Sequence, residues 1–270
     1  MKLHPDWVVP QWPAATNVKA VFTTRVGGVS RPPFDTFNLG RPSGDDPMAV
    51  DNNRARLQTA IGAAPVFLSQ VHGVQTVELG PASSAGSGAP IEADACVSAT
   101  PRVVCSVRVA DCLPVLLTDE DGTVVAAAHA GWRGLANGVL EGNFRCFEAL
   151  VQRQSGRQSD AHVAGRTLAW LGPCIGPEAF EVGPEVRTAF VAHDAAAASC
   201  FSAKAGGKWL ADLAALARLR LRALGLSRIY GNDSTAPWCT VGNPSRFFSH
   251  RRDSVRLGGS GRMAACIWIT

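Results

Sequence analysis

Apolar residues occur along the chain in short runs, separated by turns rich in glycine, proline and small polar residues. Runs of small and β-branched side chains predict strands at 19–25, 67–70, 103–109, 113–118, 123–129, 169–171 and 263–269. Apolar residues at helical spacing predict helices at 49–61, at 207–224 and from residue 135 onwards. No internal repeat is visible, and long helices alternate with some of the strands. The pattern predicts one α/β domain over residues 1–270, of the α+β type with a mixed sheet.

The most informative junction follows the strand predicted at 123–129. This run ends in His129 and turns directly into a glycine-rich segment, Gly131-Trp132-Arg133-Gly134, before helical spacing begins. Ligands of open α/β sheets bind at the carboxyl ends of the strands. The start of a helix there also offers free N–H groups to an anion. The junction therefore predicts a ligand site near His129.

Two loops interrupt this pattern. Residues 27–47 form a long polar segment rich in glycine and proline, and such loops in compact domains are frequently functional. Residues 80–90 consist mainly of glycine, alanine, serine and proline. We expect a flexible loop there and not a domain linker, because the strands on either side belong to one sheet system.

Composition narrows the class of protein. The chain has 270 residues, is 46% hydrophobic and carries a net charge of only +4, which supports a buried core but no broad binding of nucleic acid or membrane surfaces. No apolar run reaches the length of a membrane span. Pro5 and Asp6 stand where a signal peptide would be apolar, so we expect a cytoplasmic protein with its eight cysteines as thiols. No C-x-x-C pair is present, which argues against a zinc knuckle or a thioredoxin-type motif.

Three turns at the ends of apolar runs each carry a side chain able to bind a metal. These side chains are His72, Cys112 and His129, separated by 40 and 17 residues along the chain. Three protein ligands with an open fourth position are typical of catalytic zinc, and the neighbouring Asp111 could orient a histidine or move a proton. The separations match no compact ligand motif, so a capped histidine and a buried, inert cysteine remain the alternative.

Several arginines lie beside glycine-rich or polar turns and are candidates for binding phosphate or carboxylate. Each could also be a solvated surface residue. They are Arg25, Arg54, Arg133, Arg251 and Arg252. The segment 247–253, Phe-Phe-Ser-His-Arg-Arg-Asp, could line a pocket for a base and a phosphate, or could be a strand end with a salt-bridged turn. His162 and His193 stand in polar or alanine-rich stretches, and we expect both at the surface.

Nine short motifs occur in a fixed order from about residue 20 to the end of the chain. Together they resemble the purine nucleoside phosphorylase family formerly called polyphenol oxidase or laccase-domain proteins, some of whose bacterial members are called peptidoglycan editing factors. Each motif is weak alone, but the ordered series is specific. The motifs are 23–30, 38–40, 44–47, 70–73, 93–95, 110–115, 129–134, 172–176 together with 180–183, and 248–253.

The resemblance implies a single domain of the cytotoxic-necrotising-factor-like cysteine hydrolase fold. It implies a metal, usually zinc, held by His72, Cys112 and His129. It further implies that adenosine, inosine, guanosine or S-methyl-5'-thioadenosine reacts with phosphate to give a base and a sugar-1-phosphate, with adenosine deamination as a side activity. We expect no nucleic-acid or membrane partner, and a monomer or small homo-oligomer.

Other functions fit parts of the same pattern. Two histidines and a cysteine are also the ligands of a blue-copper site, but a multicopper oxidase needs many histidines in close pairs, and this chain has six dispersed ones. Cys112 could instead be the nucleophile of a metal-free hydrolase that edits cell-wall precursors, with His72 or His129 as its base. A regulator that binds a metabolite without turnover has no positive sign in the sequence.

Overall fold

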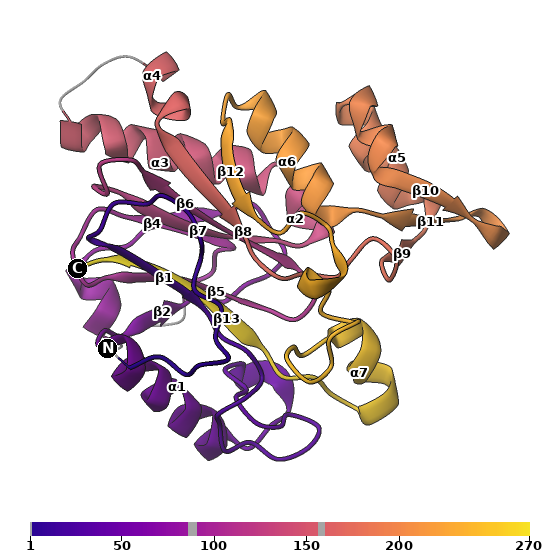
Figure 1. The fold of residues 1–270 in the computed structure, drawn as a ribbon, viewed down its shortest axis with the longest axis horizontal. Coiled ribbons are helices and arrows are strands. Elements are labelled where there is room, and N and C mark those ends of the chain that lie inside the picture. Colours follow the sequence, from indigo (N-terminus) through magenta and orange to yellow (C-terminus); the bar gives the residue numbers. More distant parts are fainter. Residues whose placement is uncertain (1, 86–90, 156–159) are drawn as a thin grey trace.

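Two β-sheets face each other at the centre of the molecule (Figure 1). The computed structural model describes residues 2–85, 91–155 and 160–270. The smaller sheet has the order β1-β13-β5-β2 and the larger has the order β12-β8-β6-β7-β4-β3, with parallel and antiparallel neighbours in both. Their strands are β1 (Val18–Phe22), β2 (Pro65–Phe67), β3 (Thr76–Glu78), β4 (Ala95–Ser98), β5 (Val104–Val109), β6 (Leu113–Asp119), β7 (Val125–Ala130), β8 (Thr167–Leu171), β12 (Arg228–Gly231) and β13 (Met263–Ile269).

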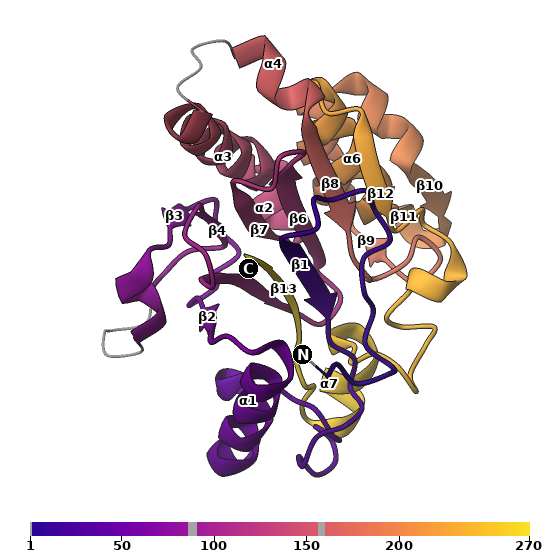
Figure 2. The same ribbon diagram turned by 60° about the vertical axis from the view of Figure 1, so that its left-hand side comes forward.

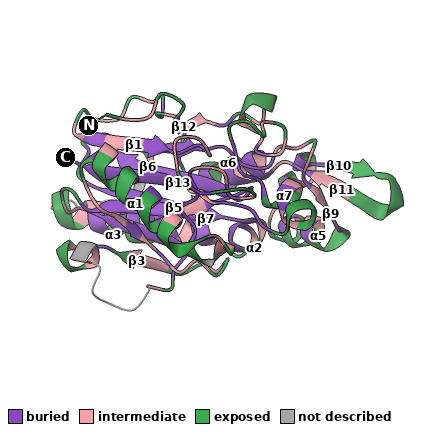
Figure 3. Cartoon of the chain, turned by 90° about the horizontal axis from the view of Figure 1, so that it is seen from below, coloured by how far each residue is buried: buried purple, intermediate pink, exposed green. Residues whose placement is uncertain are grey.

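Helices cover the outer faces of both sheets, as Figures 1 and 2 show from two directions. Helix α1 packs on the smaller sheet, whereas α3 and α6 pack on the larger one. A third, small sheet of order β10-β11-β9 lies beside α5, and its β10–β11 hairpin projects from the body with an exposed tip (Figure 3). The remaining elements are α1 (Pro47–Ile61), α2 (Trp132–Ala136), α3 (Val139–Ser155), α4 (Asp160–Gly165), α5 (Pro184–His193), α6 (Leu213–Ala223), α7 (His250–Leu257), β9 (Glu181–Val182), β10 (Phe201–Lys204) and β11 (Lys208–Ala211).

The central strands are apolar on both faces because each face meets another layer. Every residue of β6 and β7 is buried. Alternate side chains of β6 point to opposite faces, so Val115 and Leu117 join the core under α3 and α6, while Leu116 joins the core between the sheets. This sandwiched position explains why these strands appear in the sequence as continuous apolar runs and lack a polar alternation.

The structure confirms the mixed α/β class and most of the predicted elements, with four differences. The strand predicted at 67–70 lies earlier, as β2 at Pro65–Phe67. The helix predicted at 207–224 is wrong at its start, because residues 208–211 form β11 and α6 begins only at Leu213, after Asp212 accepts the Ala215 N–H. The helical region after His129 is divided into α2 and α3, and Gly138 at the break has φ of +96°. In the 80–90 loop, Pro81–Ala85 is a 3-10 turn and 86–90 lies outside the described residues.

The sheet registers bring several chain segments to one end of the sandwich. Leu113 at the start of β6 pairs with Ala130 at the end of β7, and Val115 pairs with Leu171 at the end of β8. In the smaller sheet, Met263 at the start of β13 pairs with Val109 at the end of β5. The β5–β6 turn crosses from one sheet to the other at this same end. Residues distant in sequence therefore meet there.

Among the helices that the structure describes, none combines the length and apolar character needed to cross a bilayer.

The long 27–47 loop is held against α1 by one buried amide. Asn53 accepts the Val29 N–H and donates to Ser30 Oγ and to the carbonyl oxygens of Thr36 and Asn38, over 2.9–3.1 Å. The side chain of Asn53 has no exposure to solvent. The loop is thus anchored through hydrogen bonds, which its composition could not reveal.

We predict that Asn53→Ala lowers the free energy of unfolding by about 2–3 kcal/mol, because four hydrogen bonds are lost and the loop's polar groups remain buried. Urea unfolding measures the change. Asn52→Ala, an exposed neighbour on the same helix, is the control and should change stability by less than about 0.5 kcal/mol. Equal stability of the two variants would contradict this account of the loop.

Candidate active site

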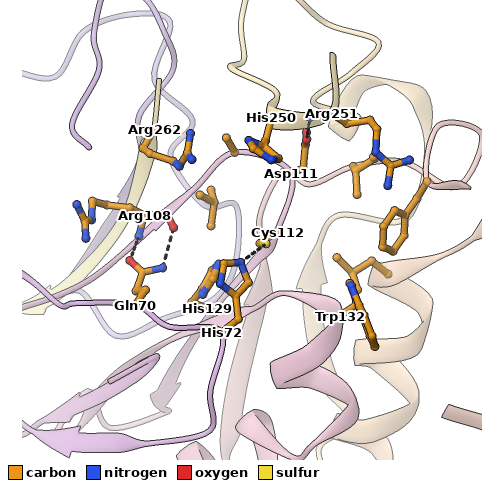
Figure 4. Close-up of a pocket in the computed structure, with 15 residues that line it drawn as sticks. Gln70, His72, Arg108, Asp111, Cys112, His129, Trp132, His250, Arg251 and Arg262 are labelled. Atoms are coloured by element: carbon orange, nitrogen blue, oxygen red, sulfur yellow. Dashed lines mark hydrogen bonds between the residues drawn. The ribbon is translucent and has the colours of Figure 1, made fainter. Parts of the chain in front are cut away.

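The three predicted ligand residues meet at the end of the sandwich where the sheet registers converge (Figure 4). The donor atoms of His72, Cys112 and His129 all lie within 4.8 Å of one another. His72 follows β2, Cys112 lies in the β5–β6 turn, and His129 is the second-last residue of β7. Cys112 Sγ lies 3.8 Å from His72 Nε2, and the two histidine rings are 4.8 Å apart in an edge-to-face arrangement. The group can therefore close around one small ion.

Asp94 orients both histidines from behind. Its buried carboxylate accepts His129 Nδ1–H at 2.8 Å and the backbone N–H groups of Val71, His72 and Gly73 at 2.7–3.1 Å. These bonds hold His72 in the left-handed region, at φ of +61°, and leave His129 Nε2 facing the group. Burial alone would raise the pKa of Asp94, but the bond to His129 and the backbone bonds lower it. In the sequence, the only sign of this role of Asp94 is its place between Ala93 and Ala95, directly before β4.

Asp111 has a different place from the one predicted. It contacts neither histidine: its carboxylate accepts hydrogen bonds from Thr240 Oγ1, Ser249 Oγ and the Arg251 N–H, at 2.6–3.0 Å. Its backbone has φ of +88°, which only a strongly constrained non-glycine residue adopts. Asp111 thus fastens the β5–β6 turn to the start of α7 and aims the adjacent Cys112 at the histidines.

Gly131 leaves the space that the ligand group occupies. A Cβ atom at this position would lie 2.9 Å from Cys112 Sγ and 3.0 Å from His72 Cδ2. Both distances are shorter than carbon contacts allow, so any side chain here would displace two of the three donors. The glycine-rich turn therefore serves the site by close approach of the backbone.

The charges in the group stabilise each other. Burial would raise the pKa of Cys112, but the charge of His129 and hydrogen bonds from both histidines outweigh it and lower the pKa to about 6. Burial would lower the pKa of His129, yet Cys112 and Asp94 raise it to about 9. Without a metal, the group therefore holds a thiolate beside an imidazolium at neutral pH. A bound cation would take the place of the imidazolium proton and contact the thiolate directly.

A cavity of about 350 Å³ opens over the group. Its lining combines polar and charged side chains with an apolar wall that contains aromatic rings. The polar lining residues are Gln70, Arg108, Asp111, His250, Arg251 and Arg262, and the wall contains Trp132, Ile175, Phe180 and Leu213. Figure 4 shows Arg251 above the aromatic wall and Arg262 at the opposite end.

The structure separates the five candidate arginines, of which Arg252 forms an ion pair with Asp253. Arg251 lines the cavity, with its guanidinium 5.6 Å from the Phe180 ring centre. Arg25 is paired with Asp35, Arg54 donates to the Leu39 carbonyl oxygen, and exposed Arg133 stacks on Trp132. These three are not among the lining residues. Sequence reasoning missed Arg108 and Arg262, because each lies at the end of an apolar strand without a motif of its own.

The 247–253 segment combines features of both interpretations. Phe247 and Phe248 are buried in the core, and Arg252 bonds Asp253, as a salt-bridged turn would require. The turn opens a helix and does not end a strand, because Ser249 accepts the Arg252 N–H as the cap of α7. His250 and Arg251 at the start of that helix line the cavity. His193 is exposed as expected, whereas the side chain of His162 lies outside the described residues.

The fold and site define a mixed α/β protein with a candidate metal centre in an arginine-lined cavity. The model of the multi-copper polyphenol oxidoreductase laccase family matches residues 19–270, and the chain belongs to this family. This confirms the resemblance inferred from the ordered motifs.

Similar proteins cover almost the whole chain. "Purine nucleoside phosphorylase YfiH" of Escherichia coli (strain K12) is 47% identical over 267 residues, covering 97% of this chain and 98% of that protein. A purine nucleoside phosphorylase of Pseudomonas aeruginosa is also 47% identical, with the same coverage of 97% and 98%. The crystal structure of a Neisseria meningitidis protein has a TM-score of 0.85 and 42% identity, covering 98% of this chain and 99% of that one.

We predict that Cys112 in metal-free protein reacts with iodoacetamide as a thiolate, with a rate that is half-maximal at about pH 6 and flat above it. Mass spectrometry of the Cys112 peptide measures the rate at each pH. His129→Gln removes the cationic partner, so the midpoint should move upward toward the ordinary range near 8.5. Cys146→Ala, which removes an exposed thiol on α3, is the control and should leave the profile unchanged. A midpoint near 8.5 in the unmodified sequence would contradict the thiolate assignment.

Proposed function

We propose that this protein is a zinc-dependent purine nucleoside phosphorylase. Its substrates are adenosine, inosine, guanosine and S-methyl-5'-thioadenosine, which react with phosphate to give the base and a sugar-1-phosphate, and it deaminates adenosine as a side activity. The observation that carries the proposal is the convergence of His72, Cys112 and His129 below a cavity with an aromatic wall and unpaired arginines. The names of the relatives support the same reaction.

The donor set suits zinc. Two imidazole nitrogens and one thiolate, with a carboxylate behind one histidine, are a known catalytic zinc arrangement with room for a fourth ligand. When bound, zinc would supply a Lewis acid at the floor of the cavity and lower the pKa of a water molecule. Copper, which the family description mentions, fits less well, because no methionine is among the described residues that line the cavity and the chain has only six histidines.

The cavity's own side chains can bind and orient a nucleoside. Trp132 and Phe180 line the cavity with aromatic rings that can pack against a purine, and Arg251 above them can donate to a ring nitrogen of the base, and also to the carbonyl oxygen of guanine or hypoxanthine. In phosphorolysis a phosphate oxygen attacks C1′, the C1′–N9 bond breaks, and the bonding electrons pass to the base, which takes up a proton. A donor such as Arg251 stabilises the charge that builds on the departing base.

A second candidate function uses the same thiol without a metal. The pairing of Cys112 with His129 is the arrangement of a cysteine nucleophile, and for such a hydrolase the family resemblance implies peptidoglycan precursors as substrates. Cytoplasmic location and the cytotoxic-necrotising-factor-like fold name stay predictions under either function.

We predict that zinc-loaded protein converts inosine and phosphate to hypoxanthine and ribose-1-phosphate, and that Cys112→Ala lowers the turnover at least 100-fold. Chromatography of the base measures turnover, and elemental analysis measures metal content. Cys146→Ala, on the exposed face of α3, should retain full activity and metal. No hypoxanthine from inosine and no adenine from methylthioadenosine would refute the proposal. Full activity after chelation, with inactivation by a thiol alkylator, would instead favour Cys112 as a metal-free nucleophile.

We predict that Asp94→Asn weakens zinc binding about 10- to 100-fold, because the amide cannot accept from His129 and the three backbone N–H groups as the carboxylate does. Competition with a chromogenic chelator measures the affinity. Glu92→Gln, an exposed carboxylate two residues earlier, is the control and should bind zinc normally. Unchanged affinity in Asp94→Asn would show that the buried carboxylate does not support the ligand group.

A further inference from the structure

Arg262 has a fixed guanidinium at the end of the cavity away from the aromatic wall (Figure 4). Its Nη1 donates to the carbonyl oxygens of Ser260 and Gly261, at 2.7 and 3.1 Å. Its backbone N–H donates to Asn38 Oδ1 at 2.8 Å, and its aliphatic stem lies against Gly40, where a Cβ would approach it to 2.6 Å. The side chain is therefore held in place by neutral groups, before any ligand binds.

Burial lowers the pKa of Arg262, and the charges of Cys112 and Asp111 raise it to a smaller extent. In the part of the chain that the structure describes, Arg262 forms no ion pair, and its Nε and Nη2 atoms have no hydrogen-bond acceptor. Asp111 is the one carboxylate among the described lining residues, and three donors from Thr240, Ser249 and Arg251 already occupy it. Two guanidinium nitrogens thus remain for a ligand.

The surrounding charges are also positive. Burial and then the charge of Arg262 lower the pKa of Arg108 to about 10. Burial and then the charge of Arg108 lower the pKa of Arg54 to about 10, and burial and then the charge of Arg262 lower the pKa of His250. Cations crowded in a low-dielectric region repel one another, and a bound anion relieves that repulsion.

Arg262 is better placed than the other two arginines of the cavity. Arg108 donates to the Leu68 carbonyl oxygen, and Figure 4 shows its guanidinium directed away from the His–Cys–His group. Arg251 lies over Phe180 and donates to the Glu181 carbonyl oxygen. Only Arg262 combines free donors with a position across the ligand group from the apolar wall.

We propose that Arg262 binds the phosphate reactant, and that this residue sets the direction in which a nucleoside lies in the cavity. The inference rests on the proposed function. The base lies against Trp132 and Phe180 beneath Arg251, the phosphate lies at Arg262, and the bond that breaks is between them, over His72, Cys112 and His129. The planar guanidinium can donate two parallel hydrogen bonds to one phosphate group.

The test compares four variants of the zinc-loaded protein in inosine phosphorolysis. Arg262→Met should raise the KM for phosphate about 10- to 100-fold and change the KM for inosine less than threefold, because one charge-assisted hydrogen-bonding group is lost. Arg262→Lys keeps the charge without the planar fork and should fall between. Arg251→Met should raise the KM for inosine instead, and Arg256→Met, on the exposed side of α7, should change neither.

Direct binding separates this inference from the proposed function. Calorimetric titration with inorganic phosphate should show binding to the unmodified protein and at least tenfold weaker binding to Arg262→Met. That result without any phosphorolysis would refute the proposed function and support the anion site. An unchanged phosphate affinity and KM in both Arg262 variants would overturn the inference, as would no phosphate binding to the unmodified protein. If Arg262→Met does not fold by circular dichroism, the Lys variant decides alone, with at least a threefold weaker phosphate affinity expected.

Discussion

The carboxylate of Asp94 is the interaction on which the site depends. It is fully buried, which is costly for a charge, and four hydrogen bonds from the His72 turn and from His129 offset that cost. The bonds join segments from the two sheets, since His72 follows β2 and His129 is the second-last residue of β7. Loss of this carboxylate would remove the bonds that hold the His72 turn and the His129 ring at once.

The third donor is placed by a separate device with the same logic. Cys112 lies in a turn that crosses between the two sheets, and Asp111 fixes that turn by bonding Thr240 and the start of α7. A single change of backbone direction, at φ of +88°, brings the thiol to the histidines. One buried carboxylate, Asp94, thus holds the two histidines, and a second, Asp111, holds the turn that carries Cys112.

The electrostatics give the cavity a polarity. The thiolate and imidazolium of Cys112 and His129 balance each other, so the group itself adds little net charge. Two of the lining arginines lie at opposite ends of the cavity, Arg251 over an aromatic wall and Arg262 among carbonyl oxygens. An uncharged ring at one end and an anion at the other fit this distribution, as a nucleoside and phosphate would.

The sequence alone determined the strand-rich α/β class, the membership of the family and the three donor residues, because buried strands and glycine turns leave local patterns. It could not determine that Arg54 and Arg133 lie off the cavity while Arg262 lines it, since those positions follow from how the helices and strands pack together. For the same reason, the sequence could not show that Asp94, and not Asp111, bonds to His129. Hydrogen bonds between segments far apart in the chain leave no periodicity, so only the tertiary structure decided which carboxylate holds a histidine and which arginine stays unpaired.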